Sequence, residues 1–331
     1  MENVIINAYA IDSRNIGDLA SSPTQYFDFK YPVETLDFRA IDPKFPKPKS
    51  GFGGSITLDE IKNTAHRVRY HLILGGGGLI CQKFLGSFEA IKKLKSIFRG
   101  KWMVWGIGQQ VYPSFSSSKG NLLEYLDSNC RTFDYAKYLQ AFDQVGIRDA
   151  GFNYDWLPCA SCMHPTFDQK REIKHEFVVY SHRKFQLKVE RFPVLTNEDQ
   201  SLEEVIDFLG SGETILTSSY HGAYWGTLLG RKVIVFPFTT KFLTLKHLPS
   251  IYPVSQWKYS RINFKFRPFK TTFLNKIKLE FRYGEDKYTC RTNNWRGLLA
   301  NCAIYPHILQ ECRDANLQFH QKTMELLGDI T

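Results

Sequence analysis

The sequence predicts an α/β protein made of two successive halves, each built around a parallel sheet. Short apolar runs typical of buried strands alternate with segments of helical spacing in both halves. Glycine or polar residues follow the ends of several of these runs. The chain has 331 residues, of which 43% are hydrophobic and 23% charged, a composition typical of a globular chain long enough for two domains. We expect the domain boundary near residue 168, which gives domains 1–168 and 169–331.

The first half alternates strands and helices in chain order. Thr57 and Glu60 form a capping-box pattern, which predicts a helix that continues to about residue 70. A loop rich in Pro, Lys and Gly covers residues 45–54. The predicted strands are 3–10, 71–74 and 102–108; the predicted helices are 57–70 and 88–98; and residues 138–149 form a helix that leads into a short strand.

The second half repeats the alternation. Residues 177–184 open a second sheet, and Ser201 with Glu204 predicts the start of a helix that ends near residue 208. The remaining predicted elements are strands at 213–219 and 232–238, a helix at 223–229 closed by Gly230, and a long terminal helix at 307–327.

The chain gives no indication of export or of a membrane span. No apolar run reaches the roughly 20 residues that a spanning helix needs, and the N-terminus carries an acid rather than the lysines of a signal peptide. The seven cysteines are unevenly spaced, which favours reduced thiols in the cytoplasm. Cys159 and Cys162 lack a second ligand pair, so we predict that they pack in the interior and that the protein holds no metal.

The net charge of +10 predicts an anionic partner. Residues 241–282 contain ten Lys or Arg and one acid, Glu280, with aromatic residues between them. A solvated basic face with core aromatics explains this segment. Peripheral docking at the anionic inner face of the membrane, or to a lipid-linked substrate, also explains it. No nucleic-acid-binding motif accompanies the charge, so we expect no nucleic acid partner. We also expect no cofactor.

The unusual polar residues follow the carboxyl ends of predicted strands, which is the edge where parallel sheets bind ligands. Asn15 and Asp18 follow the first strand, Arg148 follows another, and His182 with Arg183 follow the first strand of the second half. Arginine at such an edge binds carboxylate or phosphate. Asp149 fits an internal partner of Arg148 better than a catalyst. The run of Gly75, Gly76, Gly77 and Gly78 fits either a tight turn or a set of amides that converge on an anion.

The segment around His221 is the most informative. His221 lies between a predicted strand and a helix, where the helix dipole lowers the pKa of an imidazole and leaves it suited to proton transfer near neutral pH. Ser218 and Ser219 precede it, Gly222 follows it, and Lys241 comes just after the next predicted strand. If these strands are neighbours, a proton-transfer group and a fixed positive charge share one edge. A cleft between the two halves would place Arg148 opposite them.

Six stretches in this order resemble the polysaccharide pyruvyltransferase family. They are NIGD, GGGGLI, WGIG, GIRD, the block SSYHGAYWGTLLGRKVIVFP, and a lysine twenty positions after the histidine. The resemblance covers roughly residues 3–245 and is most specific in the block from His221 to Lys241. It implies two Rossmann-like domains that face a cleft in the GT-B arrangement, with a long C-terminal helix.

The resemblance also implies a reaction and roles for residues. The donor would be phosphoenolpyruvate and the acceptor a sugar, often lipid-linked, of a cell-surface polysaccharide. Arg148 and Lys241 would bind the donor, helped by Ser218, Ser219 and Gly222. His221 would be the catalytic acid or base, with Asp18 as the second proton-transfer residue. Residues for the acceptor or an anion would be Asn15, Gly75, Gly76, Gly77, Gly78, His182 and Arg183. The family commonly has an arginine where this chain has Ser219.

Two alternatives use the same sequence features. A GT-B glycosyltransferase with a nucleotide-sugar donor would need a similar cleft and basic residues, together with a glutamate placed to hold a ribose. Glu213 precedes its predicted strand rather than following it. A membrane-associated binding protein would instead use the basic segment 241–282 and have an inactive cleft.

Overall fold

A computed structural model describes most of the chain. The described residues are 1–48, 51–113, 121–189, 191–198, 200–261, 286–292 and 294–328, together with the backbone of the strands Phe264–Lys265, Pro268–Phe269, Lys278–Leu279 and Arg282–Tyr283. Within them the protein is an α/β structure with two parallel sheets, one of six strands and one of five.

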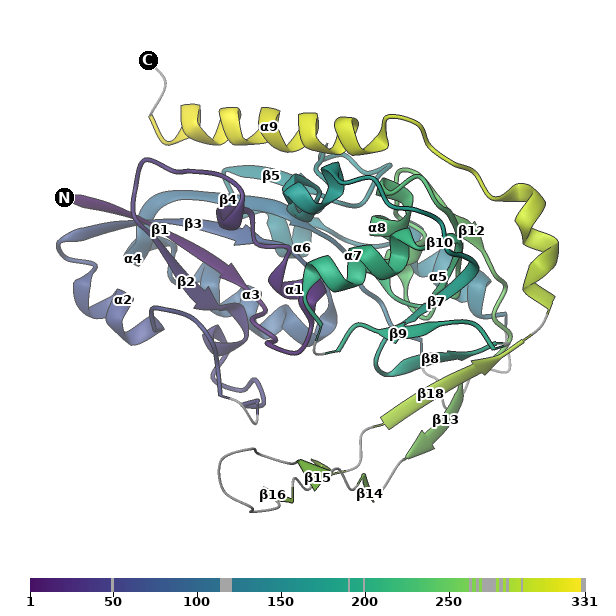
Figure 1. The fold of residues 1–331 in the computed structure, drawn as a ribbon. Helices are drawn as coiled ribbons and strands as arrows, with labels where there is room; N and C mark the ends of the chain where they lie inside the picture. The colour runs from purple at the N-terminus through teal and green to yellow at the C-terminus, as the bar shows by residue number, and fades with distance from the viewer. Residues whose placement is uncertain are drawn as a thin grey trace.

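The first sheet contains six parallel strands in the order β2-β1-β3-β4-β5-β6 (Figure 1). Their bounds are β1 Glu2–Tyr9, β2 Val33–Asp37, β3 Val68–Gly75, β4 Arg99–Ile107, β5 Gln144–Ile147 and β6 Asp155–Trp156. The central strands are buried on both faces, as their continuous apolar runs require. Their carboxyl ends lie at one edge of the sheet because all six run in the same direction.

The helices of the first half are shorter than predicted. They are α1 Ile16–Leu19, α2 Leu58–Thr64, α3 Leu85–Lys92, α4 Lys95–Phe98, α5 Leu122–Arg131 and α6 Ala136–Leu139. The capping box of Thr57 and Glu60 is present, but α2 ends at Thr64 and the residues from Val68 onward pair with β1. Sheet pairing there overrides the helical continuation that the sequence predicted, and β2 and α5 were not predicted.

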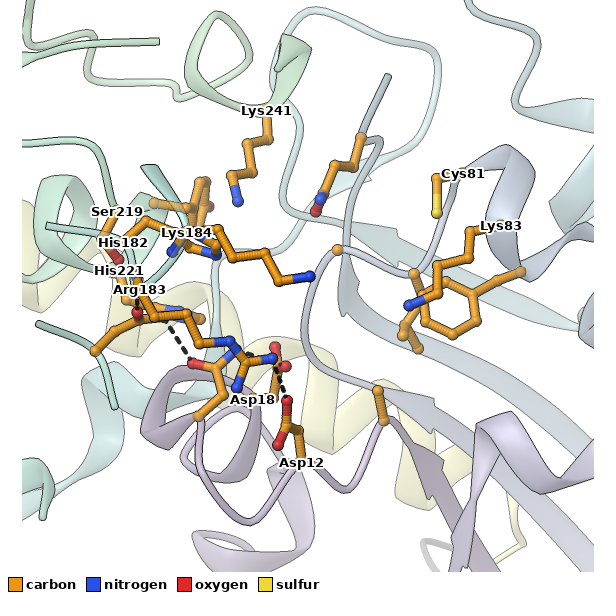
Figure 2. A pocket seen from close by; sticks show the side chains of 18 of the residues that line it. Asp12, Asp18, Cys81, Lys83, His182, Arg183, Lys184, Ser219, His221 and Lys241 are labelled. Carbon is orange, nitrogen blue, oxygen red and sulfur yellow. Dashed lines mark hydrogen bonds and ion pairs between the residues drawn. The ribbon is translucent and has the colours of Figure 1, made fainter. Parts of the chain in front are cut away.

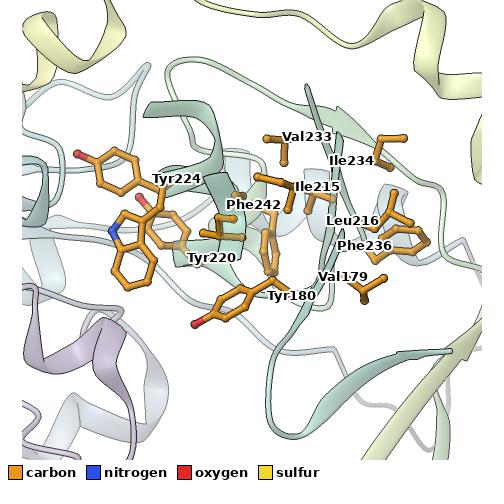
Figure 3. Packing of buried hydrophobic residues seen from close by; sticks show 14 of the residues in the cluster. Val179, Tyr180, Ile215, Leu216, Tyr220, Tyr224, Val233, Ile234, Phe236 and Phe242 are labelled. Atoms are coloured by element: carbon orange, nitrogen blue, oxygen red, sulfur yellow. The ribbon is translucent and has the colours of Figure 1, made fainter. Parts of the chain in front are cut away.

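The second sheet contains five parallel strands in the order β12-β11-β10-β7-β9. They are β7 His175–Ser181, β9 Val194–Thr196, β10 Gly212–Thr217, β11 Lys232–Val235 and β12 Ser250–Ile251. Helices α7 Leu202–Gly210 and α8 Tyr220–Leu228 pack on this sheet, and α7 has the predicted capping box. Figure 3 shows the core on both faces of these strands, where Ile215 and Val233 lie on the side of α8 and Leu216 and Ile234 lie on the other side with Phe236.

The basic segment 241–282 does not form one surface in the residues that the structure describes. Lys241 is buried, and Lys246 pairs with Glu311 of the terminal helix at 2.5 Å. Trp257 belongs to the core, which agrees with the interpretation that this segment is a solvated basic face whose aromatic residues are buried. Strand β13 Lys258–Arg261 joins β18 Asp286–Arg291 and β8 Phe185–Lys188 in a three-stranded sheet. The remaining basic residues of the segment lie outside the described side chains.

The terminal helix α9, Ile308–Leu326, follows the second sheet in sequence but packs on the first (Figure 1). The Trp105 indole nitrogen donates to the Asn316 side-chain oxygen at 2.8 Å, and the Phe319 ring meets the Trp105 ring edge-on at 4.9 Å. This helix therefore ties the end of the chain to the sheet that begins it.

Among the described residues, none of the helices combines the length and the apolar composition that crossing a membrane requires.

Candidate functional site

Loops at the carboxyl ends of strands from both sheets border one cavity of about 200 Å³. Its walls include six cationic side chains and only two carboxylates, which makes it a site for anions. The cations are Arg39, Lys83, Arg148, Arg183, Lys184 and Lys241, and the carboxylates are Asp12 and Asp18.

Polar contacts join the two halves beside this cavity. Arg183 pairs with Asp12 at 2.8 Å, and the Asn197 side chain donates to the Asn15 side-chain oxygen at 3.2 Å (Figure 2). These contacts place Asn15 and Arg183, both predicted from the sequence as anion-binding, at the junction of the halves. Arg183 serves in part as a structural partner of Asp12, although its Nη1 has no hydrogen-bond acceptor among the described residues.

His221 is held at the start of α8 by its neighbours. Ser219 is the N-cap of α8 and accepts from the Gly222 amide at 3.4 Å, so the imidazole emerges from the first turn of the helix. The ring packs on Trp225 at 4.8 Å between centroids. On its other side it meets α1 at Gly17, where any side chain would collide with the ring.

Burial lowers the pKa of His221 well below its usual value, and the positive charges of Arg148 and Lys241 lower it further. The imidazole is therefore neutral near pH 7 and able to accept a proton. The sequence predicted this direction of the shift from the helix dipole. In the structure the larger cause is the burial of a side chain that is only 7% exposed.

A buried chain of polar contacts reaches the His221 ring from behind. The Trp225 indole nitrogen can only donate, and it donates to the Ser161 hydroxyl at 2.9 Å. Ser161 Oγ lies 3.2 Å from Cys159 Sγ, which in turn lies 3.7 Å from His221 Nε2. Burial raises the pKa of Cys159, so this sulfur is a thiol. Nε2 thus faces a buried thiol, and Nδ1 is the ring atom that lies nearest to Gly17 of α1.

Arg148 is the most unusual residue of the site. It is 3% exposed, and no acceptor in the described part of the chain receives a hydrogen bond from its guanidinium. Its guanidinium carbon lies 3.8 Å from the centroid of the Tyr220 ring, a stacked position that fixes its plane. An unpaired buried cation costs free energy, and a bound anion would remove that cost.

Asp149, next in sequence to Arg148, is an internal anchor, as the sequence analysis preferred. Its buried carboxylate accepts from the Gln109 amide at 2.6 Å, from Tyr135 at 2.8 Å and from Thr244 at 2.6 Å. The bond to Thr244 connects the first half to the loop that carries Lys241.

Lys241 enters the cavity from that loop, which follows β11. The loop is fixed to the first half, since Thr240 and Val111 exchange hydrogen bonds at 3.0 and 3.2 Å. The ammonium lies over Phe238 at 4.9 Å, and Lys241 is 7% exposed. Burial, together with Arg148, lowers the pKa of Lys241 to about 7, with Asp18 acting in the opposite direction.

Asp18 is the second titratable group at this end of the cavity. Burial and the neighbouring Asp12 carboxylate raise its pKa, whereas Lys241 and Arg183 act in the opposite direction. The Asn15 side chain donates to Asp18 at 2.7 Å and fixes its orientation. A carboxyl group with a raised pKa is suited to general acid-base chemistry.

Several residues that the sequence placed in the site do not border the cavity. Ser218 accepts from the His182 amide at 3.0 Å and donates to the Phe185 carbonyl, so it holds the loop after β7. Gly222 lies against Thr217 and Tyr180 within α8. Their contribution to the site is structural. Ser219 does border the cavity, where it supplies a hydroxyl.

The glycine run makes the tight turn of the first interpretation that the sequence allowed. Gly75 lies against Pro23, and Gly76 lies against Ser21 with a φ of 80°, which is the tight turn of the first interpretation. Gly77 also has a positive φ, of 86°. Gly78 alone of the four borders the cavity, 3.3 Å from Arg148 Nη2 as measured from an ideal Cβ position.

His182 also borders the cavity, and its Nδ1 accepts from the Lys184 amide at 3.1 Å. Burial and nearby cations lower the pKa of His182 well below its usual value.

Sequence reasoning missed Lys83, Lys184 and Arg39 as cavity residues. Lys83 follows the glycine run by five positions and Lys184 follows Arg183 directly, so their placement after strand ends was an available signal.

In the described residues, the His, Cys, Asp and Glu side chains form no group of three or more that is placed to hold a metal. Cys159 and Cys162 are both buried.

Comparisons with known proteins add little to this site. No family model matches the sequence, and no curated protein matches it. One similar solved structure is that of a functionally uncharacterised protein from Klebsiella pneumoniae subsp. pneumoniae NTUH-K2044. The two share 16% identity over 71% of this chain and 83% of that chain, with a TM-score of 0.37. A score of that size establishes no function.

Proposed function

We propose that the protein is a pyruvyltransferase of the GT-B type, which transfers the enolpyruvyl group of phosphoenolpyruvate to a sugar of a cell-surface polysaccharide or its lipid-linked precursor. The observation that carries the proposal is Arg148, a buried guanidinium without an acceptor, beside Lys241 and a neutral His221. Two parallel sheets whose carboxyl ends border one cavity are the arrangement that a GT-B enzyme requires.

Donor binding uses the two buried basic residues. The donor carries a carboxylate and a phosphate, and Arg148 with Lys241 offers one charge for each. The planar guanidinium fits a two-point contact with either group, whereas the ammonium acts as a point charge. Because both residues are buried, their attraction for an anion is screened less by water than at the surface.

The reaction moves two hydroxyl protons and breaks one carbon–oxygen bond. Protonation of the donor methylene makes a methyl group and an oxocarbenium-like centre, which the acceptor hydroxyls attack. The bond from this carbon to the phosphate oxygen breaks, and phosphate leaves. Of the two protons lost by the acceptor hydroxyls, one balances the proton that was given to the methylene. The other is taken up by the released phosphate. The products are a pyruvate ketal and inorganic phosphate.

Two residues divide the proton transfers. His221 is neutral, so it takes the proton of the attacking hydroxyl. We assign the proton given to the methylene to Asp18, because burial and the Asp12 carboxylate raise the pKa of its carboxyl group. Arg148 and Lys241 stabilise the phosphate as negative charge develops on it. This scheme needs no cofactor.

The direct test is incubation with phosphoenolpyruvate labelled with carbon-13 at its central carbon and a pool of surface-glycan precursors. The proposal expects inorganic phosphate to appear together with a ketal carbon signal, and expects His221→Ala to lose both. Transfer of sugar from a nucleotide sugar, with no use of phosphoenolpyruvate, would replace the proposal with the glycosyltransferase alternative. Glu213, which that alternative would need at the cavity, instead pairs with Lys232 at 2.9 Å.

A further inference from the structure

The cavity has a second cationic cluster that the proposed donor does not use. Lys83, from the short 3₁₀ helix Gln82–Phe84 after β3, and Lys184, from the loop after β7, both border the cavity. Figure 2 shows their ammonium groups extended toward the same space from opposite walls. Both side chains are exposed, whereas Arg148 and Lys241 are buried. The two lysines therefore lie at the mouth of the cavity.

These two lysines have no acidic partner in the part of the chain that the structure describes. Within the described ranges no carboxylate pairs with either ammonium and no acceptor bonds to it. The two carboxylates of the cavity are already occupied, since Asp12 pairs with Arg183 and Asp18 accepts from Asn15. Arg39, which also borders the cavity, is paired with Asp37 at 2.7 Å.

The surroundings of Lys83 hold it toward the opening. Its ammonium lies over the rings of Phe45 and Phe84 at 5.1 and 5.5 Å, and these two rings stack on each other. Partial desolvation lowers the pKa of Lys83, and Lys184 lowers it further, so the two ammonium groups repel each other across the mouth. Like charges that face one another without a counter-charge are stabilised by an anion between them.

The deep and outer cations act on different residues at the two ends of the cavity, and Lys241 and Lys184 both act on His182 between them. Arg148 and Lys241 are the charges that act on His221, while Lys184 and Arg39 are those that act on Lys83. A donor held by Arg148 and Lys241 would thus leave the outer pair without an anion. The acceptor has to enter through this mouth to reach the donor.

We propose that Lys83 and Lys184 form a second anion subsite, which binds a phosphate group carried by the acceptor. This inference rests on the proposed function for the identity of the acceptor, but not for the existence of the subsite. Lysine fits a phosphate as a mobile point charge and needs no fixed two-point geometry. The acceptor class is therefore a phosphorylated or diphosphate-linked sugar rather than a neutral glycan.

Pyrophosphate, titrated calorimetrically with and without saturating phosphoenolpyruvate, tests the subsite. The wild-type protein should still bind pyrophosphate when phosphoenolpyruvate occupies the deep site. The double variant Lys83→Met/Lys184→Met should weaken that binding at least tenfold and leave the affinity for phosphoenolpyruvate within about twofold. The matched control is Lys93→Met/Lys137→Met, which removes two exposed lysines that do not border the cavity.

The outcomes separate the two proposals. If phosphoenolpyruvate does not bind, the proposed function fails. The outer subsite is then tested in Arg148→Ala without any donor. Pyrophosphate should still bind to this variant, and the addition of Lys83→Met and Lys184→Met should abolish that binding. If the lysine variant weakens phosphoenolpyruvate as much as pyrophosphate, the lysines belong to the donor site and the subsite is wrong. Pyrophosphate binding that the variant leaves unchanged also overturns it. UDP-N-acetylglucosamine in solution and vesicles that contain farnesyl diphosphate distinguish a nucleotide-linked from a lipid-linked source.

Discussion

The deep end and the mouth of the cavity each carry two cationic side chains, but the two ends differ in how far these side chains are buried. At the deep end Arg148 and Lys241 are almost inaccessible and the pKa of Lys241 falls to about 7. At the mouth Lys83 and Lys184 are exposed to water. The two buried cations lie beside His221 and Asp18, where burying charge without an ion-pair partner costs free energy. Under the proposed function, the deep end serves the chemistry and the mouth serves recognition of the acceptor.

The largest effect should come from His221. His221→Ala should lower kcat by roughly 10²- to 10⁴-fold, the range for loss of a general acid-base group, and should leave the Kd for phosphoenolpyruvate within a fewfold. The measurement is phosphate release under saturating donor, with binding followed separately. His66→Ala, which removes an exposed histidine far from the cavity, is the control. Near-normal turnover in His221→Ala would remove the deep end from the chemistry.

Substitution of Arg148 should have the next largest effect: it should lower donor affinity and raise the thermal midpoint of the free protein. Arg148→Met keeps much of the packing on Tyr220 but removes the charge. Donor affinity should fall on the order of 100-fold, as for the loss of two charge-assisted hydrogen bonds. The thermal midpoint of the free protein should rise by about 1–3 °C, because an unpaired buried cation is gone.

Scanning calorimetry with and without phosphoenolpyruvate measures both changes. A midpoint that falls in the free variant would mean that Arg148 has a structural role, and the contrast between the deep end and the mouth would disappear. Lys184→Met, an exposed cavity cation, should leave the midpoint unchanged.

Lys241 makes donor binding depend on pH. Its lowered pKa leaves it mostly neutral above pH 7 in the empty cavity, and a bound anion favours the charged form. Binding should therefore take up a proton at about pH 8, and affinity should fall as pH rises above 7. Well below pH 7 Lys241 is already charged, so donor binding should no longer take up a proton there.

Titration calorimetry in buffers of different ionisation enthalpy counts this proton. Lys241→Met should abolish the uptake at pH 8, whereas Lys184→Met should retain it. If Lys241→Met still takes up a proton at pH 8, another group titrates on donor binding. His221 is the nearest candidate.

Cys159 should show the smallest effect at the deep end. Cys159→Ala removes the sulfur 3.7 Å from His221 Nε2 and should lower kcat up to about tenfold without altering donor affinity. A tautomer change of the imidazole, read from long-range proton–nitrogen correlations, distinguishes this positioning role from simple destabilisation. Cys162→Ala is the matched control, since this buried thiol contacts Asn316 rather than the histidine. Equal effects of the two substitutions would exclude a specific role for Cys159.

The sequence predicted the elements that have strong local patterns. The capping boxes at Thr57 and Ser201, the terminal helix and the alternation of parallel strands were readable because their causes lie within a few residues. Strand β2 and the early end of α2 were not, because pairing with β1 decides them.

In the site, too, features with local causes could be predicted and features set by distant residues could not. His221, Asp18, Arg148 and Lys241 were identified because each follows a strand end, and the structure brings all four to one cavity. The structural role of Ser218 could not be read, because its partners His182 and Phe185 are 36 and 33 residues away in the sequence. The contact of Cys159 with His221 joins residues 62 positions apart, and nothing local encodes it.

The most direct test of the central claim is thermal unfolding of the purified protein with phosphoenolpyruvate and, separately, with nucleotide sugars. Ligand at 100 times its Kd stabilises a folded protein by roughly 2.7 kcal/mol, which is a shift of a few degrees in a chain of this size. We predict a shift with phosphoenolpyruvate that Arg148→Met abolishes. A shift with a nucleotide sugar alone would contradict the account and assign the cavity to a glycosyltransferase.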